Sequence, residues 1–198
     1  MASEKYIIVT AENSFHISLR NVLDPGGYVF MGSCGDPAGT IRLVRSFHPD
    51  FAIIDSAVSL GHMRLAIETI DDEKLCSCII MAESRNPEIQ SILDETSVVS
   101  FSKKNAYPDV LLNTVEMSLE SFRRIRELNR RLTQANARSK SRDLLEIAKA
   151  ILIRNESLTE NEAYNKIRMR SMDLRVPIKE IAESVISLEN MKKRKKKR

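Results

Sequence analysis

The sequence predicts an α/β domain built on a parallel sheet, followed by a long helix and a small helical bundle. Two observations carry this prediction. In the first half of the chain, short and nearly continuous apolar runs alternate with amphipathic segments. After Pro108, apolar residues recur every three or four positions and no further strand pattern appears. A chain of 198 residues is long enough for one large domain or two small ones.

Five apolar runs in the first half are typical of strands buried on both faces, because apolar residues do not alternate with polar ones. These runs are residues 6–10, 28–34, 50–55, 77–82 and 98–102. The segments between them have helical spacing; they are residues 15–23, 37–47, 61–70 and 87–95. This alternation predicts a doubly wound, flavodoxin-like parallel sheet of five strands, in which ligands bind at the carboxyl ends of the strands.

From Pro108 onward the sequence predicts one long helix. Its apolar positions are Leu111, Val115, Leu119, Phe122, Ile125, Leu128 and Leu132. Packing against the helix's own sheet explains the stripe as far as Leu119 but not beyond Phe122. A heptad stripe that continues past its domain is typical of helix pairing, so we expect a parallel coiled-coil homodimer. Residues 133–142 lack this stripe and are expected to form a loosened helix or a linker.

The sequence predicts three short helices over residues 143–190. Apolar spacing indicates the first, over 143–155. A capping box, Thr159 with Glu162, marks the start of the second, and Pro177 suits the first position of the third. A bundle of this size is marginally stable alone, so attachment to a dimeric stalk would help it.

Charge is distributed unevenly along the chain. Residues 1–119 carry 9 basic and 16 acidic side chains, whereas residues 120–142 carry 8 basic and 2 acidic ones. Residues 143–191 carry 7 basic and 9 acidic side chains, and all seven residues of 192–198 are basic. This pattern favours a polyanionic partner for the second half only. We expect the basic tail, residues 191–198, to be disordered.

Several classes of protein are not expected. No apolar run is long enough to span a bilayer, and the N-terminus lacks the pattern of a signal peptide. The three cysteines, Cys34, Cys76 and Cys78, have no framework spacing, which is typical of reduced thiols in a cytoplasmic protein. The histidines are scattered, and neither a glycine-rich phosphate loop nor a pair of catalytic acids is evident. We therefore expect no enzymatic activity and no membrane partner.

The first candidate site lies where two predicted strands end. Asp55 closes the third strand, and Lys104, with Lys103 beside it, follows the fifth at the same edge of the sheet. Residues 5 to about 120 resemble the receiver domain of two-component response regulators. The resemblance implies that Asp55 occupies the position of the residue that accepts a phosphoryl group, and Lys104 that of the residue that reads it.

The rest of this site departs from the family pattern. Receivers hold Mg²⁺ with an acidic pair after the first strand, because the metal neutralises charge during phosphoryl transfer. Here Thr10 and Ala11 occupy these positions, and Glu12 comes one place late. Ala82 stands where the family has a Ser or Thr. We expect a pseudo-receiver without a cofactor, gated by a partner such as a ligand-sensing protein. The alternative is an active receiver with a weak Mg²⁺ site at Glu12 and Asp55, served by a sensor histidine kinase.

The second candidate site lies in the predicted bundle. Residues 143–186 resemble the ANTAR domain of transcription antiterminators; the matching positions are Ala148-Lys149, Glu162-Ala163-Tyr164, Ile167-Arg168, Ser171-Met172, Arg175 and Ile181-Ala182. Ala150 departs from the family, where Gly is common. The resemblance implies binding to paired RNA stem-loops in a nascent leader transcript, which prevents a terminator hairpin from forming.

Readers of RNA loops use aromatic stacking and cations that bind phosphates. The candidate RNA-binding residues are Lys149, Ala163, Tyr164, Arg168, Arg170, Ser171, Met172, Arg175 and Lys179. Two other functions are open. Residues 178–186 resemble the first helix of a DNA-binding helix-turn-helix, and the stalk and bundle suit a protein-interaction adaptor. The predicted parts are a receiver-like domain over 1–120, a stalk and linker over 108–142, an RNA-binding bundle over 143–190 and the tail.

Overall fold

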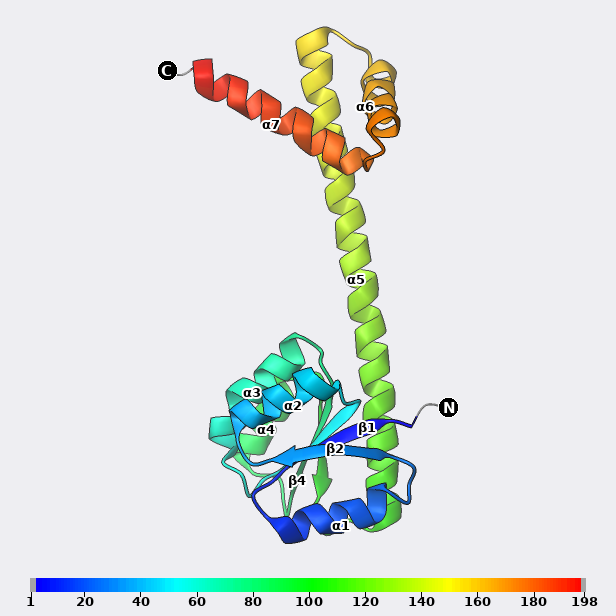
Figure 1. Ribbon diagram of the computed structural model, residues 1–198. Helices are drawn as coiled ribbons and strands as arrows, with labels where there is room; N and C mark the ends of the chain where they lie inside the picture. The colour runs from blue at the N-terminus through cyan, green and yellow to red at the C-terminus, as the bar shows by residue number, and fades with distance from the viewer. Residues whose placement is uncertain (1–2, 197–198) are drawn as a thin grey trace. The chain divides into compact units, whose positions relative to one another are not determined.

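The computed structural model describes residues 3–196, with side chains up to Met191 (Figure 1). The strands are β1 (Lys5–Val9), β2 (Val29–Cys34), β3 (Phe51–Asp55), β4 (Ser77–Ala82) and β5 (Val99–Lys103). The helices between them are α1 (Asn13–Leu23), α2 (Pro37–Phe47), α3 (Leu60–Asp72) and α4 (Pro87–Glu95). Three more helices follow: α5 (Pro108–Glu156), α6 (Glu160–Leu174) and α7 (Ile178–Lys196). The chain divides into an N-terminal unit, up to Leu128, and a C-terminal unit, from Asn129 on.

The N-terminal unit confirms the predicted sheet. All five strands are parallel, in the order β2-β1-β3-β4-β5. Asp55, the last residue of β3, lies opposite Met81, and Ala82 lies opposite Lys103 at the end of β5. The sheet therefore brings the carboxyl ends of β3 and β5 to the same edge, as the doubly wound order requires.

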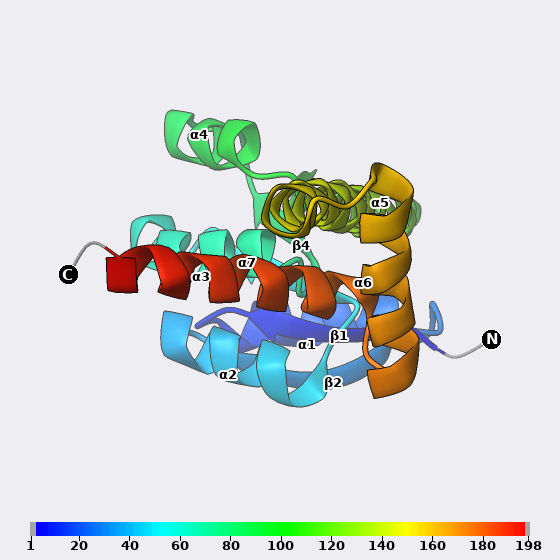
Figure 2. The same cartoon turned by 90° about the horizontal axis from the view of Figure 1, so that it is seen from above.

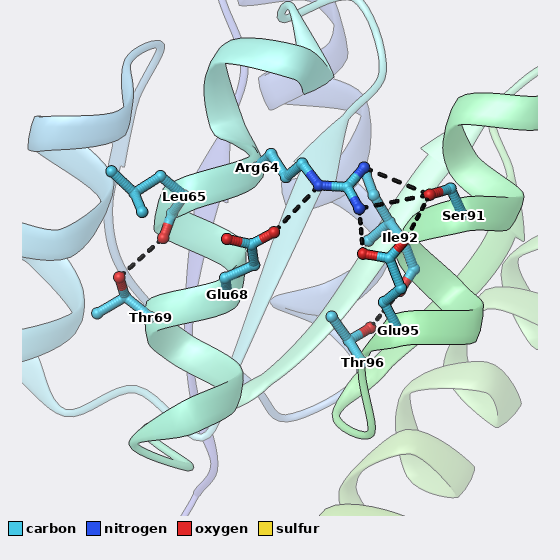
Figure 3. Close-up of polar contacts among 8 residues, drawn as sticks. All are labelled: Arg64, Leu65, Glu68, Thr69, Ser91, Ile92, Glu95 and Thr96. Carbon is cyan, nitrogen blue, oxygen red and sulfur yellow. Dashed lines mark hydrogen bonds and ion pairs between the residues drawn. The ribbon is translucent and has the colours of Figure 1, made fainter.

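The strands bury alternate residues on opposite faces of the sheet, which follows from the two-residue repeat of a strand. Ile7 and Ile54 belong to the core covered by α2, α3 and α4. Tyr6 and Ile53 belong to the opposite core, which α1 and the first turns of α5 cover. Polar contacts also join neighbouring helices on the outside of the first core (Figure 3). There, Arg64 of α3 donates through Nε to Glu68 (3.0 Å) and through Nη1 to Ser91 of α4 (3.3 Å), and it also pairs with Glu95.

The structure corrects part of the predicted dimer stalk. Four of the stripe residues are at least 95% buried within the N-terminal unit: Leu111, Val115, Leu119 and Phe122. They are unavailable to a second copy because the start of α5 is itself the cover of the sheet. Ile125 is partly buried against the same unit. Leu128 and Leu132 remain 65% and 60% exposed.

Residues 133–142 form no break. They continue α5, which is helical from Pro108 to Glu156. The first helix of the predicted bundle is therefore the end of α5. The tail prediction also needs correction, because residues 191–196 continue α7; residues 197–198 lie outside the described part of the chain.

The C-terminal unit packs the end of α5 against α6 and α7. Figures 1 and 2 show α6 folded back beside the last turns of α5, and α7 leading away across them. The buried residues of its small core are Ala148, Leu152, Ala163, Ile167, Ile181 and Ala182. The predicted capping box is present: Thr159 Oγ1 accepts from Glu162 N (3.4 Å), and Thr159 N donates to Glu162 Oε2 (2.8 Å).

Within the described residues, no helix is both long and apolar enough to cross a membrane. Cys34, Cys76 and Cys78 are all free thiols. Cys76 and Cys78 flank the first residue of β4 and are fully buried, as expected of small residues around a buried strand.

Candidate phosphoacceptor site and candidate RNA interface

The carboxylate of Asp55 is fully buried and fully engaged. Thr10 Oγ1 donates to Oδ2 at 2.8 Å, and the backbone N–H of Ala57 donates to Oδ1 at 2.9 Å. Lys104 Nζ lies 2.5 Å from Oδ1. Asp55 exposes none of its side chain to solvent, and Lys104 exposes 17%. A buried charge needs such a partner, because the loss of its hydration is otherwise uncompensated.

Backbone pairing and one aromatic ring position Lys104. Its N–H donates to the carbonyl of Ala82 at 3.0 Å, which extends the pairing of β4 and β5 by one residue. Its ammonium lies 4.9 Å from the centroid of the Phe15 ring, a cation–π contact from α1. Lys103 is exposed. Of the two adjacent lysines, the structure therefore brings only Lys104 to Asp55.

Thr10 occupies the place of a receiver's acidic pair. Besides donating to Asp55, its hydroxyl accepts from the N–H of Glu12 at 3.0 Å. The side chain of Glu12 is exposed. Ala82 is buried, and its methyl side chain offers no hydrogen bond. Of the predicted receiver-site residues, Asp55 and Lys104 are therefore in contact, whereas the side chains of Glu12 and Lys103 are exposed.

These residues do not fit Mg²⁺. The ion prefers an octahedral set of oxygens that usually includes one or two carboxylates. Asp55 is the one buried carboxylate here, and an ammonium and two hydrogen bonds already occupy its oxygens. In the part of the chain that the structure describes, no three His, Cys, Asp or Glu residues are grouped so that they could hold a metal ion.

Sequence reasoning missed the two side chains that complete this arrangement, the Thr10 hydroxyl and the Phe15 ring. Thr10 directly follows β1, so its place at the strand edge was readable. No pattern in the sequence indicated that the Thr10 hydroxyl would donate a hydrogen bond to Asp55. Phe15 carries no signal of its own, because an aromatic residue on an amphipathic helix usually marks the core.

In the C-terminal unit, one side of α6 presents an exposed row of aromatic, cationic and thioether groups. Tyr164, Arg168 and Met172 are each four residues apart, which places them on one helix face, and Arg175 follows at the C-terminal end of the helix. Tyr164 is 39% and Met172 61% exposed, and both arginines are exposed. Arg175 ends α6 in the left-handed conformation, with φ of 53°. We call these four residues the α6 row.

Three predicted RNA-binding residues have structural roles instead. Ala163 is fully buried in the bundle core. Lys149 is only 7% exposed, and its Nζ lies 2.8 Å from Glu146 and 2.7 Å from Glu160; these carboxylates raise the pKa of Lys149. Ser171 donates to the carbonyl of Val176 at 2.6 Å, which holds the turn between α6 and α7. Each of these three side chains therefore contributes to the packing or to the turn of the bundle.

The remaining two candidates lie off the α6 row. Arg170 is on the opposite flank of α6, where it lines a cavity of about 220 Å³ between the three helices. Lys179 of α7 pairs with Glu183 at 3.7 Å. Two further ion pairs border this cavity and had no signal in the sequence. Glu189 accepts from Arg154 (2.5 Å), and Lys166 pairs with Glu156.

Comparison with known proteins agrees with both halves of this description. The ANTAR domain family matches residues 133–186. The transcriptional regulatory protein PdtaR of Mycobacterium tuberculosis is 25% identical over 183 residues, covering 92% of this chain and 89% of that protein. Both relationships include the region that holds the α6 row.

Solved structures match the N-terminal unit. The receiver domain of the putative response regulator NarL from Mycobacterium tuberculosis aligns with a TM-score of 0.53 and 13% identity, covering 60% of this chain and 97% of that one. The receiver domain of a modulated diguanylate cyclase from Desulfovibrio desulfuricans G20 aligns with a TM-score of 0.55 and 17% identity, covering 61% and 97%. At these identities the likeness establishes the fold alone. The chain thus joins a unit of the receiver fold to a C-terminal segment, residues 133–186, that matches the ANTAR domain.

Proposed function

We propose that this protein is a transcription antiterminator whose dimer presents two ANTAR bundles to paired stem-loops in a nascent leader RNA. Held in that fold, the RNA does not form an overlapping terminator hairpin, and transcription continues. The observation that carries the proposal is the exposed α6 row inside the residues that match the ANTAR domain.

The chemistry of the α6 row suits unpaired bases. RNA loops expose unstacked bases, and a Tyr ring stacks on such a base whatever its identity. A guanidinium binds a phosphate with two parallel hydrogen bonds or stacks on a base. Tyr164 and Arg168 are one helical turn apart, so a single nucleotide can contact both.

The exposed part of α5 supports a parallel dimer. Leu128, Leu132 and Ala135 fall at core positions of one heptad register, with Ser139 next along the seam. In this register the g positions are Arg124, Arg131 and Arg138, and the e positions are Asn129, Asn136 and Asp143. A parallel pair sets each g residue against the e residue five positions further on in the other helix, which matches Arg with Asn or Asp. An antiparallel pair sets Arg against Arg, which is repulsive.

The receiver-fold unit is proposed to be impaired in phosphoryl transfer. Asp55 is buried beneath Thr10 and Lys104, and the surrounding residues do not suit the metal that the reaction needs. Control then comes from a partner, such as a ligand-sensing protein, that binds this unit and shifts the dimer equilibrium. A sensor histidine kinase is the expected partner in the alternative case of an active receiver.

Binding measurements on the full chain test the proposal. We expect tandem hairpins to bind more tightly than either hairpin alone, because two linked sites raise the effective concentration. Duplex DNA at the same salt should bind weakly. Tyr164→Ala should weaken binding to tandem hairpins by about 5- to 150-fold, the range for loss of one base stack.

Arg168→Gln supplies a second, charge-based test, with Arg170→Gln as its matched control on the opposite flank of the same helix. We expect the first substitution to weaken RNA binding strongly and the second to have little effect. Equal effects of the two substitutions, or equal affinity for single and tandem hairpins, would contradict the proposal.

The same experiment decides between the alternatives. Preference for duplex DNA would favour a helix-turn-helix function. Over the described residues, however, α7 runs unbroken to Lys196, without the turn and second helix that this function requires. Absence of nucleic-acid binding at low salt, together with co-purification of a protein partner, would favour the adaptor.

A further inference from the structure

The middle of α5 carries a run of basic side chains. From Leu128 to Arg142 the helix has five basic side chains and no acidic one: Arg130, Arg131, Arg138, Lys140 and Arg142. All five are exposed. We call residues 130–142 the α5 basic segment. Apart from Leu128 and Leu132 at its start, its surroundings on α5 are polar or small.

Other parts of the same helix neutralise their cations. Arg124 pairs with Glu120 one turn earlier, and Lys149 lies between Glu146 and Glu160. Arg130 and Arg131 also make interactions, and the inference does not depend on them. Among the described residues, no carboxylate pairs with Arg138, Lys140 or Arg142.

An ordinary solvent-exposed helix does not explain this composition. Such helices gain stability from acidic and basic residues three or four positions apart, whereas like charges at that spacing destabilise them. Arg138 and Arg142 are four positions apart with no acid between them. Within one chain these two like charges therefore repel each other across a helical turn, and a bound polyanion would relieve that repulsion.

The charge of the bundle shows where a phosphate partner would be neutralised. Residues 143–191 carry 7 basic and 9 acidic side chains, and four of the cations are paired with carboxylates: Lys149, Arg154, Lys166 and Lys179. The bundle can supply local contacts to a loop but little attraction for a long phosphate backbone. The α5 basic segment, which adjoins the bundle, can supply this attraction.

We infer that the α5 basic segment binds the phosphate backbone of the RNA stem, while the α6 row contacts the loop. The inference rests on the proposed RNA-binding function and divides it between two surfaces. Thirteen helical residues extend for about 18 Å from first to last, long enough to follow several successive phosphates. Phosphate contacts of this kind provide affinity without reading sequence, and each one adds to the salt dependence of binding.

The test uses the full chain and the triple variant Arg138→Gln/Lys140→Gln/Arg142→Gln. Affinity for tandem hairpins is measured from 50 to 300 mM KCl, with intact loops and with substituted loop sequences. We expect the slope of log affinity against log salt to become shallower by roughly two to three, since each lost contact contributes about 0.7–0.9. The preference for intact over substituted loops should stay the same.

Two controls isolate the effect of charge at this place. Arg138→Lys/Arg142→Lys keeps the charge and should keep the slope. Arg42→Gln/Arg45→Gln/Lys103→Gln removes three exposed cations from the N-terminal unit and should leave the slope unchanged. Because Arg138 and Arg142 fall at a g position and a core position of the proposed dimer register, Lys140→Gln, which lies outside the seam, provides a second variant, expected to lower the slope by about 0.7–0.9. Circular dichroism and sedimentation confirm folding and dimer state.

An unchanged slope in both Gln variants, or a reduced preference for intact loops, overturns the inference while leaving RNA binding in place. Failure of the wild-type protein to bind hairpins at low salt overturns the proposed function itself, and the inference falls with it. If the control substitutions in the N-terminal unit reduce the slope as much as the Gln variants of the α5 basic segment do, only net charge matters. That result also overturns the inference.

Discussion

Lys104 and Asp55 form a buried ion pair, with Nζ 2.5 Å from Oδ1. The carboxylate has no exposed surface and the ammonium little, so each charge depends on the other for the interactions that water would supply. The resemblance to receiver domains predicts that this pair occupies the position of phosphoryl transfer. Its two consequences, for stability and for phosphorylation, are measurable separately.

Removing only the cation should be costly to the fold. We expect Lys104→Met to lower the free energy of unfolding by about 3–5 kcal/mol at pH 7, because Asp55 is left buried and uncompensated. Asp55→Asn/Lys104→Met should recover part of this loss, since no buried charge remains. Urea unfolding followed by circular dichroism completes the double-mutant cycle. Additive losses would show that the pair is not coupled.

Phosphoryl transfer to Asp55 should be absent or very slow. Incubation with acetyl phosphate and Mg²⁺, followed by intact-protein mass spectrometry, should give no labelling above that of Asp55→Asn. The reason is that Thr10 and Lys104 hold the carboxylate oxygens and no acidic pair is present to bind the metal. Stoichiometric, Mg²⁺-dependent labelling that Asp55→Asn abolishes would refute the impaired-receiver hypothesis.

The meeting of Asp55 and Lys104 could be predicted because parallel strands end at a common edge, and the apolar runs placed both residues at strand ends. The helix stripe was harder to interpret. Packing against a sheet and pairing with a second helix both use three-to-four-residue spacing, so sequence did not show that Phe122 belongs to the core.

The ANTAR-like motif likewise did not distinguish core residues from surface residues. Its shared positions include both bundle core, such as Ala163, and exposed surface, such as Tyr164. The hydroxyl of Thr10 and the ring of Phe15 reach the site from chain positions 45 and about 90 residues away from their partners. No local pattern reports such contacts.

Asp71 should make the stability of the N-terminal unit depend on pH. Its Oδ1 accepts from the N–H groups of Ser97 (2.8 Å) and Val98 (2.9 Å), and its Oδ2 lies 3.0 Å from Lys74 Nζ. Burial raises the pKa of Asp71, but the hydrogen bonds from Lys74, Ser97 and Val98 outweigh it, so that pKa is lowered overall. The folded state therefore favours the ionised form.

A carboxyl with a lowered folded pKa stabilises the fold above its unfolded pKa of about 3.9, and this contribution is lost as pH falls through the folded value. We expect Asp71→Asn to cost about 1.5–3 kcal/mol at pH 7, the range for hydrogen bonds to a charged group. The difference from wild type should persist to about pH 5 and shrink below pH 4. Asp72→Asn, at an exposed neighbour, should change little. A difference that grows on acidification would contradict this assignment.

Dimerisation should depend on the short exposed seam of α5. Leu128 and Leu132 are more than half exposed in a single chain, and burying a leucine fully is worth about 1.5–3 kcal/mol. With four such side chains in a pair, Leu128→Glu/Leu132→Glu should raise the dimer dissociation constant about a thousandfold or more. The stability of the N-terminal unit should not change, because its core holds Leu119 and Phe122 but neither of these leucines.

Gln134→Glu/Ala137→Glu adds the same charge outside the seam and should leave the dimer intact. Sedimentation velocity from 1 to 100 µM separates the outcomes; a wild-type protein that sediments as the seam variant does at every concentration would refute the coiled-coil dimer.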